Sequence, residues 1–191
     1  LYKKSGHWKH YKDGMFPPMK RENEEYELKP MNCPHHIQIF KSRPRSYREL
    51  PLRIAEFGTF YRWENSGELS GLMRVRGMTL NDAHIFCSME QLKEEFIKAV
   101  RLVEKVYKDL NLKNFWYRLS LHDPKDKEKY GDKPEVWAGS EKAIIDALKE
   151  ANVDYKQEIG DAAFYGPKLD VQIPNALGKD ETVSTVQIDF Y

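Results

Sequence analysis

The sequence of 191 residues has only two cysteines, no long apolar run and almost no net charge. Two cysteines, Cys33 and Cys87, are too few for a secreted domain held by disulfides, so we expect an intracellular, cytoplasmic protein. No stretch reaches the roughly 20 apolar residues of a membrane helix, and the N-terminus lacks a signal-peptide core. Membrane proteins, collagen-like chains and disordered chains are therefore excluded as classes.

A hydrophobic fraction of 40% and a charged fraction of 32% instead predict a globular chain, one domain or a large piece of a bigger protein. Position 1 is not Met, and an alternating run of residues ends the chain at Tyr191, so we expect an excerpt. Residues 1–30 are rich in Lys, Glu and Tyr and predict an irregular surface segment.

Apolar residues at steps of three and four predict an amphipathic helix from about Met89 to Leu110, with Ser88 and Gln91 as its capping box. A second helix is predicted from Glu141 to Ala151, with Ser140 as its cap. Four strands are predicted at residues 57–63, 115–121, 168–173 and 182–190. Helices and strands do not alternate strictly, which favours an α+β fold around an antiparallel sheet. Residues 57–86 are expected to form a long hairpin with a mobile tip.

Seven arginines fall between residues 43 and 76 of an otherwise balanced chain: Arg43, Arg45, Arg48, Arg53, Arg62, Arg74 and Arg76. A guanidinium group grips phosphate oxygens with two parallel hydrogen bonds, so the cluster favours a polyanionic ligand. The alternative is a solvated surface with scattered ion pairs. Placement favours function, because Arg62 lies in an apolar strand and Arg74 and Arg76 alternate around Val75 toward one sheet face.

Cys33, His35 and His36 lie within four residues, and His84 follows on the far strand of the predicted hairpin. A thiolate and neutral imidazoles are ligands that zinc prefers, although a buried thiol and core histidines would explain the same residues. A third candidate is the Gly166-Pro167 turn, which would present Tyr165 and Lys168, or would be a plain surface turn.

Taken in order, six segments closely resemble the catalytic core of the threonyl-tRNA synthetases. These segments are Met31–Pro34, Leu50–Arg53, Gly71–Gly77, Asp82–Phe86, Phe164–Asp170 and Ser184–Phe190. The resemblance covers essentially the whole chain. It implies a class II synthetase fold, an antiparallel sheet flanked by helices, present here as a partial domain.

The resemblance also implies roles in activation of threonine by ATP with Mg²⁺. Arg62-Trp63-Glu64 is similar to the second class II signature motif, in which Arg62 would hold the α-phosphate and the threonine carboxylate. Glu64 would accept from the adenine amino group, and Arg74 would contact the outer phosphates. Arg62 and Arg74 would thus be catalytic, and Met78 stands where the family usually has a Phe that stacks on adenine.

This family binds zinc through one Cys and two His, and the metal takes the amino and hydroxyl groups of threonine. Cys33 and His84 match the first two ligands, whereas the third would lie beyond Tyr191. His35 stands where the family usually has Gly and is a possible substitute ligand. Asp82, Tyr165, Thr185 and Gln187 match positions that line the threonine pocket. Lys168 would add a polar group, and Met31 is also expected to bind threonine.

By this resemblance, residues 1–191 form one catalytic-core fragment without the first and third signature motifs and without editing or anticodon-binding domains. The expected partners are ATP, threonine and tRNA(Thr), the parent enzyme would be a homodimer, and the isolated fragment would be inactive. Two alternatives remain at this stage. One is a non-catalytic module that binds tRNA or a nucleotide, and the other is a related class II enzyme for another amino acid.

Overall fold

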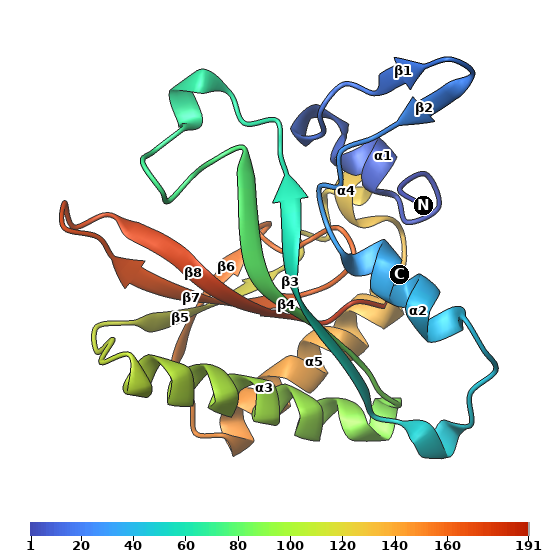
Figure 1. Ribbon diagram of the computed structural model, residues 1–191. Helices are drawn as coiled ribbons and strands as arrows, with labels where there is room; N and C mark the ends of the chain where they lie inside the picture. Colours follow the sequence, from blue (N-terminus) through green and yellow to red (C-terminus); the bar gives the residue numbers. More distant parts are fainter. Residues whose placement is uncertain (191) are drawn as a thin grey trace. The chain divides into compact units, whose positions relative to one another are not determined.

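The computed structural model describes residues 1–190; Tyr191, the last residue of the alternating run, lies outside them. The chain divides into two units, residues 1–86 and the residues from Cys87 onward, and each is described by itself. The elements of both are drawn in Figure 1. Within residues 1–190, no helix combines the length and the apolar composition needed to cross a membrane.

The first unit contains short helices and two separate hairpins. Its elements are α1 (His7–His10), η1 (Lys12–Gly14), β1 (Met19–Arg21), β2 (Glu24–Tyr26), α2 (Cys33–Lys41), η2 (Tyr47–Glu49), β3 (Leu52–Tyr61), η3 (Ser66–Glu68) and β4 (Gly77–Phe86). The prediction that residues 1–30 are irregular was wrong, because α1, η1 and the β1–β2 hairpin lie there. Their shortness explains the weak sequence signal, since three or four residues carry no clear periodicity.

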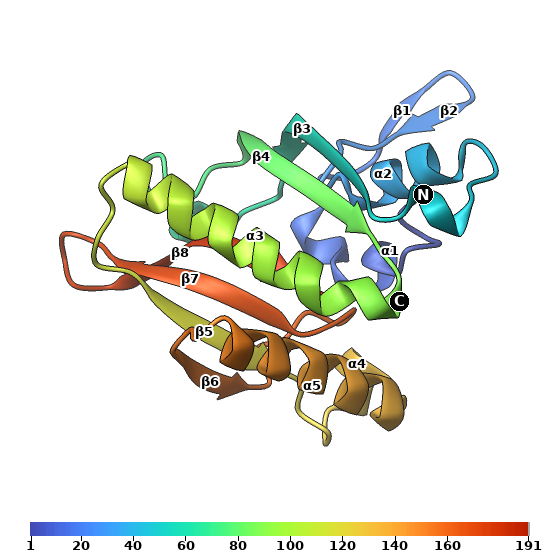
Figure 2. The same cartoon turned by 90° about the horizontal axis from the view of Figure 1, so that it is seen from below.

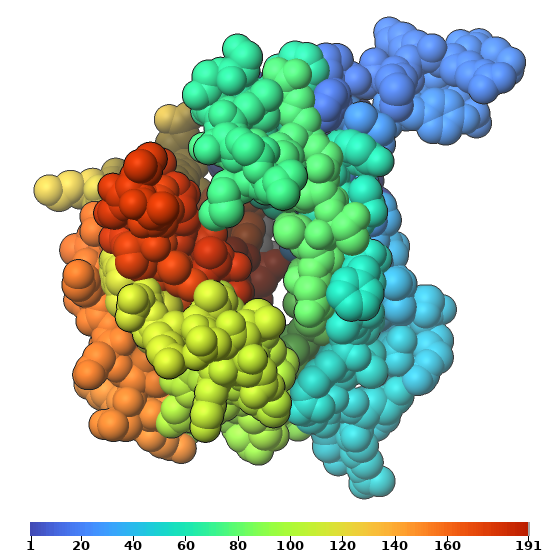
Figure 3. Space-filling view, turned by 60° about the vertical axis from the view of Figure 1, so that its left-hand side comes forward, coloured from blue at the N-terminus to red at the C-terminus, as the bar shows by residue number. Residues whose placement is uncertain are grey.

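The long hairpin predicted for residues 57–86 is confirmed, with β3 and β4 pairing antiparallel along their full length from Leu52↔Phe86 to Tyr61↔Gly77. Strand β3 begins at Leu52 rather than at Phe57, because Leu52 and Ile54 already alternate with more exposed residues. The loop that joins the strands stands at the surface in Figure 3, and its residue Leu72 is 95% exposed.

Helix α2 packs against one face of the β3–β4 hairpin, and its first turn carries Pro34, whose missing N–H is not needed there. Asn32, just before the helix, is fully buried against Gly58 of β3. A Cβ on Gly58 would lie 1.9 Å from the Asn32 amide nitrogen, so only glycine permits this approach. Close packing therefore fixes the start of α2 on the hairpin.

The second unit is a four-stranded sheet with two long helices on one face, as Figures 1 and 2 show. Its elements are α3 (Met89–Asp109), β5 (Trp116–Leu121), α4 (Lys127–Tyr130), α5 (Pro134–Glu150), β6 (Tyr155–Ile159), β7 (Lys168–Pro174) and β8 (Asp180–Gln187). The strand order is β6-β5-β7-β8, with β5 and β6 parallel and the other pairs antiparallel. The predicted α+β class is confirmed.

Helix α3 confirms the predicted helix and its start, because the Ser88 N–H donates to Gln91 Oε1 at 3.0 Å. Helix α5 is longer than predicted and begins at Pro134. The assignment of Ser140 as its cap was wrong, since Ser140 lies inside the helix and its hydroxyl donates to the Trp137 carbonyl at 3.0 Å. Proline at the first helical position was the start signal.

The apolar core of this unit lies between α3, α5 and the sheet. Six of its residues have no exposed area: Leu119, Ile144, Ala147, Leu148, Leu169 and Val171. Each large apolar side chain buried in this way stabilises the fold by roughly 1.5–3 kcal/mol. The core therefore anchors β5 and β7, the strands that carry the polar cluster described below.

Candidate active site

Alternate residues of β4 place three predicted site residues on one face of the hairpin. Met78, Asp82 and His84 are half-buried, whereas their neighbours Thr79 and Ala83 are exposed. Side chains two residues apart on a strand point to the same face. Glu56 of β3 lies directly opposite Asp82 in the register, so this face carries two carboxylates, an imidazole and a thioether.

The loop between β3 and β4, residues 62–76, gathers the arginines around Glu64, and we call it the arginine loop. The Arg74 Nε donates to Glu64 Oε2 at 2.8 Å, and the Arg76 Nε donates to the Glu64 carbonyl at 2.9 Å. Arg74 and Arg76 therefore converge on one residue, but not from a strand as predicted, because β4 begins only at Gly77. Glycines and polar residues in the loop keep the chain out of the ladder there.

Arg62 directly follows β3 and is the least engaged of these arginines. Its backbone N–H donates to the Arg76 carbonyl at 2.8 Å, whereas its guanidinium reaches only the Pro30 carbonyl, at 3.5 Å. Within residues 1–190 it makes no ion pair. A half-buried cation without a countercharge is suited to an anion supplied from outside the chain.

Tyr11 lies within electrostatic reach of this group. Burial raises the pKa of the Tyr11 phenol, with Arg62 and Arg74 opposing the rise and Glu64 adding to it. The charges of all three residues therefore act on the Tyr11 hydroxyl. The sequence offered no signal for Tyr11, because an aromatic residue in a polar segment has many ordinary roles.

The arginines before β3 fit the alternative of surface ion pairs. Arg43 donates to Glu49 at 2.6 Å, and Arg45 lies 3.6 Å from the same carboxylate. The Arg43 hydrogen bond, with the Ser46 N–H, lowers the pKa of Glu49 to about 2. Arg48 packs on the Tyr47 ring instead. These side chains are engaged with one another, so the arginine loop is the better candidate for an anion site.

Met31 and Cys33 flank Asn32 where the chain enters α2. The Tyr2 hydroxyl donates to the Met31 carbonyl at 2.8 Å. Burial raises the pKa of Tyr2, the hydrogen bond to Met31 opposes the rise, and Cys33 and Glu27 add to it. His35 contacts Tyr2 edge-on, with ring centroids 6.0 Å apart, and its buried Nδ1 has no hydrogen-bond partner within residues 1–190.

His84 is joined to α2 through His36. The two Nδ1 atoms are 2.7 Å apart, and the His36 Nε2 lies 2.9 Å from Glu56 Oε1. His36 is only 2% exposed, so both its ring nitrogens are used inside the protein. Burial lowers the pKa of His84, with Asp82 opposing this, which favours the neutral imidazole that metal ions bind.

These contacts agree in part with a metal site. Within residues 1–190 no group of three or more His, Cys, Asp or Glu side chains is arranged to hold a metal. Cys33 and His36 are three residues apart on α2 and so lie on neighbouring positions of one helix face, and His36 touches His84. Cys33 thus lies one helical turn from the residue that contacts His84, and a thiolate and an imidazole are donors that zinc prefers.

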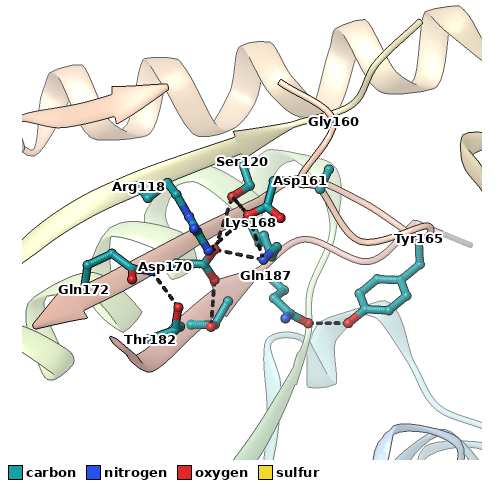
Figure 4. Close-up of polar contacts among 12 residues, drawn as sticks. Arg118, Ser120, Gly160, Asp161, Tyr165, Lys168, Asp170, Gln172, Thr182 and Gln187 are labelled. Atoms are coloured by element: carbon teal, nitrogen blue, oxygen red, sulfur yellow. Dashed lines mark hydrogen bonds and ion pairs between the residues drawn. The ribbon is translucent and has the colours of Figure 1, made fainter. Parts of the chain in front are cut away.

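In the second unit the other four predicted pocket residues lie on β7, β8 and the turn before β7. The Tyr165 hydroxyl donates to Gln187 Oε1 at 2.6 Å, as Figure 4 shows. Thr185 pairs with Asp170 in the register, and its hydroxyl donates to Asp170 Oδ1 at 2.9 Å. Lys168 donates to Asp170 Oδ2 at 2.8 Å.

Asp170 is the centre of a polar cluster that the sequence did not reveal. We call it the Asp170 cluster, with members Arg118, Ser120, Asp161, Lys168, Asp170 and Thr185. The first five are labelled in Figure 4. Burial alone would raise the pKa of Asp170, but hydrogen bonds and charge from Lys168 and Arg118 outweigh it and lower the pKa. The carboxylate is therefore held ionised and orients Lys168 and Thr185.

The Gly166-Pro167 turn is fixed against the chain that follows β8. The Ile188 N–H donates to the Pro167 carbonyl at 3.1 Å, and a Cβ on Gly166 would lie 1.8 Å from the Ile188 carbonyl oxygen. Glycine is required by this close backbone approach. The turn thus presents Tyr165 from a defined position, and it is not a loose surface turn.

Sequence reasoning missed Glu56, Arg118 and Asp170, and it named His36 only as a neighbouring imidazole, without its contacts to Glu56 and His84. Alternation in β3 could have placed Glu56 on the face of Asp82 and His84 once the strand was extended to Leu52. Arg118 and Asp170 each lie in a predicted strand as a charged residue among apolar ones, and this pattern signals a buried ion pair.

Comparison with known proteins identifies the class. A model of the tRNA synthetase class II core domain (G, H, P, S and T) matches residues 16–191. The chain therefore belongs to this family of class II tRNA synthetase core domains.

The relatives and the solved structure that match this chain are named for threonine. The chain is 60% identical over 190 residues to a threonine–tRNA ligase of Halalkalibacterium halodurans and 58% identical to threonine–tRNA ligase 1 of Bacillus subtilis. Both matches cover 100% of this chain, and the chain spans about 30% of the length of each relative. A crystal structure described as the RNA binding domain of threonyl-tRNA synthetase from Cryptosporidium parvum matches with a TM-score of 0.89 and 43% identity, over 100% of this chain and 46% of that chain.

Proposed function

We propose that the protein containing this chain activates threonine with ATP and transfers the threonyl group to tRNA(Thr). The observation that carries the proposal is Arg62, which has no countercharge and lies beside the Glu64–Arg74 pair. The threonine–tRNA ligases that match along the whole chain support the choice of amino acid.

In the activation step, a threonine carboxylate oxygen would bond to the α-phosphorus of ATP. The bond from that phosphorus to the bridging oxygen breaks, and pyrophosphate leaves with the electron pair. Two anions must approach each other, so positioned guanidinium groups lower the barrier without any proton transfer. Arg62 would bind the α-phosphate and the threonine carboxylate, Arg74 the outer phosphates, and Mg²⁺ would accompany the nucleotide.

The adenine would lie between Glu64 and Met78. Glu64 would accept from the adenine amino group through its backbone or through the carboxylate that now receives Arg74. Met78 is half-buried on the face of β4 that carries Asp82 and would pack against the ring. A thioether packs well against an aromatic ring, with a sulfur–ring contact worth about 0.3–1.5 kcal/mol.

Cys33 and His84 would hold a zinc ion, with a third protein ligand supplied from beyond Tyr191 or by His35. When bound, zinc supplies an electrophilic centre for the amino and hydroxyl groups of threonine. An apolar pocket alone distinguishes a hydroxyl from a methyl group by only about 1–3 kcal/mol. A metal ion that binds the hydroxyl of threonine would therefore reject valine far better than such a pocket.

Threonine binding would involve Met31 and Asp82 in the first unit, and Tyr165, Lys168, Thr185 and Gln187 in the second. Asp170 would hold two of these residues, Lys168 and Thr185, in place. The parent enzyme would be a cytoplasmic homodimer, in line with the compartment in which tRNA is charged for protein synthesis. A non-catalytic module is disfavoured, because pure binding has no use for both the phosphate and the adenine contacts.

The test is amino-acid-dependent exchange of pyrophosphate into ATP by the complete protein that contains this chain. We expect exchange with threonine, none with valine, and loss of both exchange and bound zinc in Cys33→Ser. Binding of ATP or tRNA without exchange for any amino acid would support the non-catalytic module instead. Exchange with a different amino acid and no zinc would assign the protein to another class II specificity.

A further inference from the structure

Three side chains in contact, Glu56, His36 and His84, connect β3, α2 and β4 inside the first unit. Glu56 Oε1 lies 2.9 Å from His36 Nε2, and His36 Nδ1 lies 2.7 Å from His84 Nδ1. The two imidazole rings are perpendicular, with centroids 4.7 Å apart. His36 is 2% exposed and Glu56 is 37% exposed, so the central ring is shielded and the carboxylate only partly so.

The positions of the protons follow from what each atom can do. A carboxylate only accepts, so the proton between Glu56 and His36 belongs to His36 Nε2. With both rings neutral, as metal ligation by His84 requires of that ring, His36 has a lone pair on Nδ1, and the short contact between the two Nδ1 atoms has His84 as its donor. His84 therefore carries its proton on Nδ1 and keeps a lone pair on Nε2.

We propose that Glu56 and His36 are positioning residues that hold His84 in the tautomer whose Nε2 can ligate a divalent metal ion. The inference rests on the zinc site of the proposed function and adds two residues to it. The reverse tautomer would place a proton on Nε2 and block ligation. The orientation of the His84 ring is fixed at the same time, because its partner His36 belongs to α2 and is hydrogen-bonded to Glu56 of β3.

The position of His36 on α2 adds a second constraint. Cys33, the proposed thiolate ligand, begins the helix one turn before His36. The helix start is in turn packed through Asn32 onto Gly58 of β3. One helix thus carries the sulfur ligand and the residue that orients the imidazole ligand, so a shift of α2 would disturb both together.

The experiment measures zinc affinity of the complete protein by competition with a chromophoric chelator. Partners that orient a metal-bound His typically affect affinity by 10–100-fold. We expect Glu56→Gln to weaken zinc binding by about tenfold or more, because an amide no longer fixes the proton on His36. Glu128→Gln, an exposed carboxylate of α4, is the control and should leave affinity unchanged.

His36 is tested by a pair of variants. His36→Leu removes the acceptor and should weaken zinc binding by about 10–100-fold. His36→Asn places an oxygen on Cγ where His36 has Nδ1, so it can still accept from His84 and should recover part of the affinity. Thermal melting checks folding, and Glu56→Gln decides the matter if His36→Leu does not fold.

The outcomes separate this inference from the proposed function. Zinc that is lost in Cys33→Ser but bound with unchanged affinity by Glu56→Gln and His36→Leu would overturn the roles of Glu56 and His36 and leave the metal site intact. A complete protein that binds no zinc at all would overturn the metal site and this inference with it. Weakened binding in both variants, with partial recovery in His36→Asn, is the result expected.

Discussion

The Asp170 cluster and the arginine loop differ in how completely their charged side chains are paired. In the cluster, Asp170 is 1% exposed and receives hydrogen bonds from Arg118, Lys168, Ser120 and Thr185. In the loop, Arg74 is about half exposed and Arg62 reaches only a backbone carbonyl at 3.5 Å. The first arrangement pairs its charges within the chain, whereas the second leaves the Arg62 guanidinium without an ion pair to any residue between 1 and 190.

The difference separates stability from function. Removal of a buried, paired charge should destabilise the fold strongly, whereas removal of a cation without an ion pair should spare the fold and remove activity. Charged groups without a full set of partners are common at binding and catalytic sites. Mutations in the two regions should therefore fall into two distinct groups.

The largest expected effect is on catalysis. Arg62→Ala in the complete protein should lower threonine-dependent pyrophosphate exchange by about 1,000-fold or more, because the charge that stabilises the transferring phosphoryl group is lost. Its thermal melting should change little. Arg43→Ala, which removes an exposed arginine paired with Glu49, is the control and should retain near-normal exchange. Near-normal activity in Arg62→Ala would refute its role.

The second effect is on folding. Asp170→Ala leaves Arg118 and Lys168 without their main buried partner and should destabilise the chain by about 3–5 kcal/mol in urea unfolding. Asp132→Ala breaks the exposed pair with Lys127 and should cost no more than about 1 kcal/mol. Equal losses in the two variants would show that the cluster is no better than a surface ion pair.

The cluster also predicts a pH dependence. The folded-state pKa of Asp170 lies below its unfolded value, because Lys168 and Arg118 outweigh the effect of burial. Its stabilisation is therefore complete above the unfolded pKa of about 4 and is lost as pH falls through the lower, folded pKa. Asp170→Asn should flatten the acid limb of stability against pH, and an unchanged limb would exclude the cluster as its cause.

A smaller effect tests the packing under α2. Gly58→Ala places a methyl group 1.9 Å from the Asn32 amide and should destabilise by about 1–3 kcal/mol. Gly67→Ala in the arginine loop meets nothing within 4 Å and should change stability by no more than about 0.5 kcal/mol. Similar values for both would mean that Asn32 can move aside freely.

The smallest effect has the opposite sign. Gly139 lies inside α5, is exposed, and has open space where a Cβ would go. Gly139→Ala should stabilise the chain by about 0.5–1 kcal/mol through lower backbone entropy in the unfolded state. A loss of stability would show that this helix surface is covered in the folded protein.

Long periodic elements could be predicted from the sequence, and short or tertiary ones could not. Helix α3 and the β3–β4 hairpin followed from spacing alone, because their side-chain periods extend over many residues. Helix α2 was missed, since its nine residues have histidines where a core helix has apolar residues. Its position depends on the contacts of His36 and Asn32 with β3 and β4.

The candidate site shows the same division. Motifs supplied Arg62, Arg74, Cys33 and His84 as residue types, and the predicted hairpin placed His84 on its second strand. The partners could not be predicted, because His36 meets Glu56 and His84 only after α2 packs on the hairpin. Arg74 was expected on a strand and lies in the loop, since the ladder begins only at Gly77.

The most direct test of the metal-centred site is zinc-edge X-ray absorption on the complete, purified protein. A site built on Cys33 and His84 predicts one sulfur at about 2.3 Å and nitrogen neighbours at about 2.0–2.1 Å from a single bound zinc. The sulfur shell should vanish in Cys33→Ser. A zinc ion surrounded only by nitrogen and oxygen, or a sulfur shell that persists in Cys33→Ser, would contradict the site proposed here.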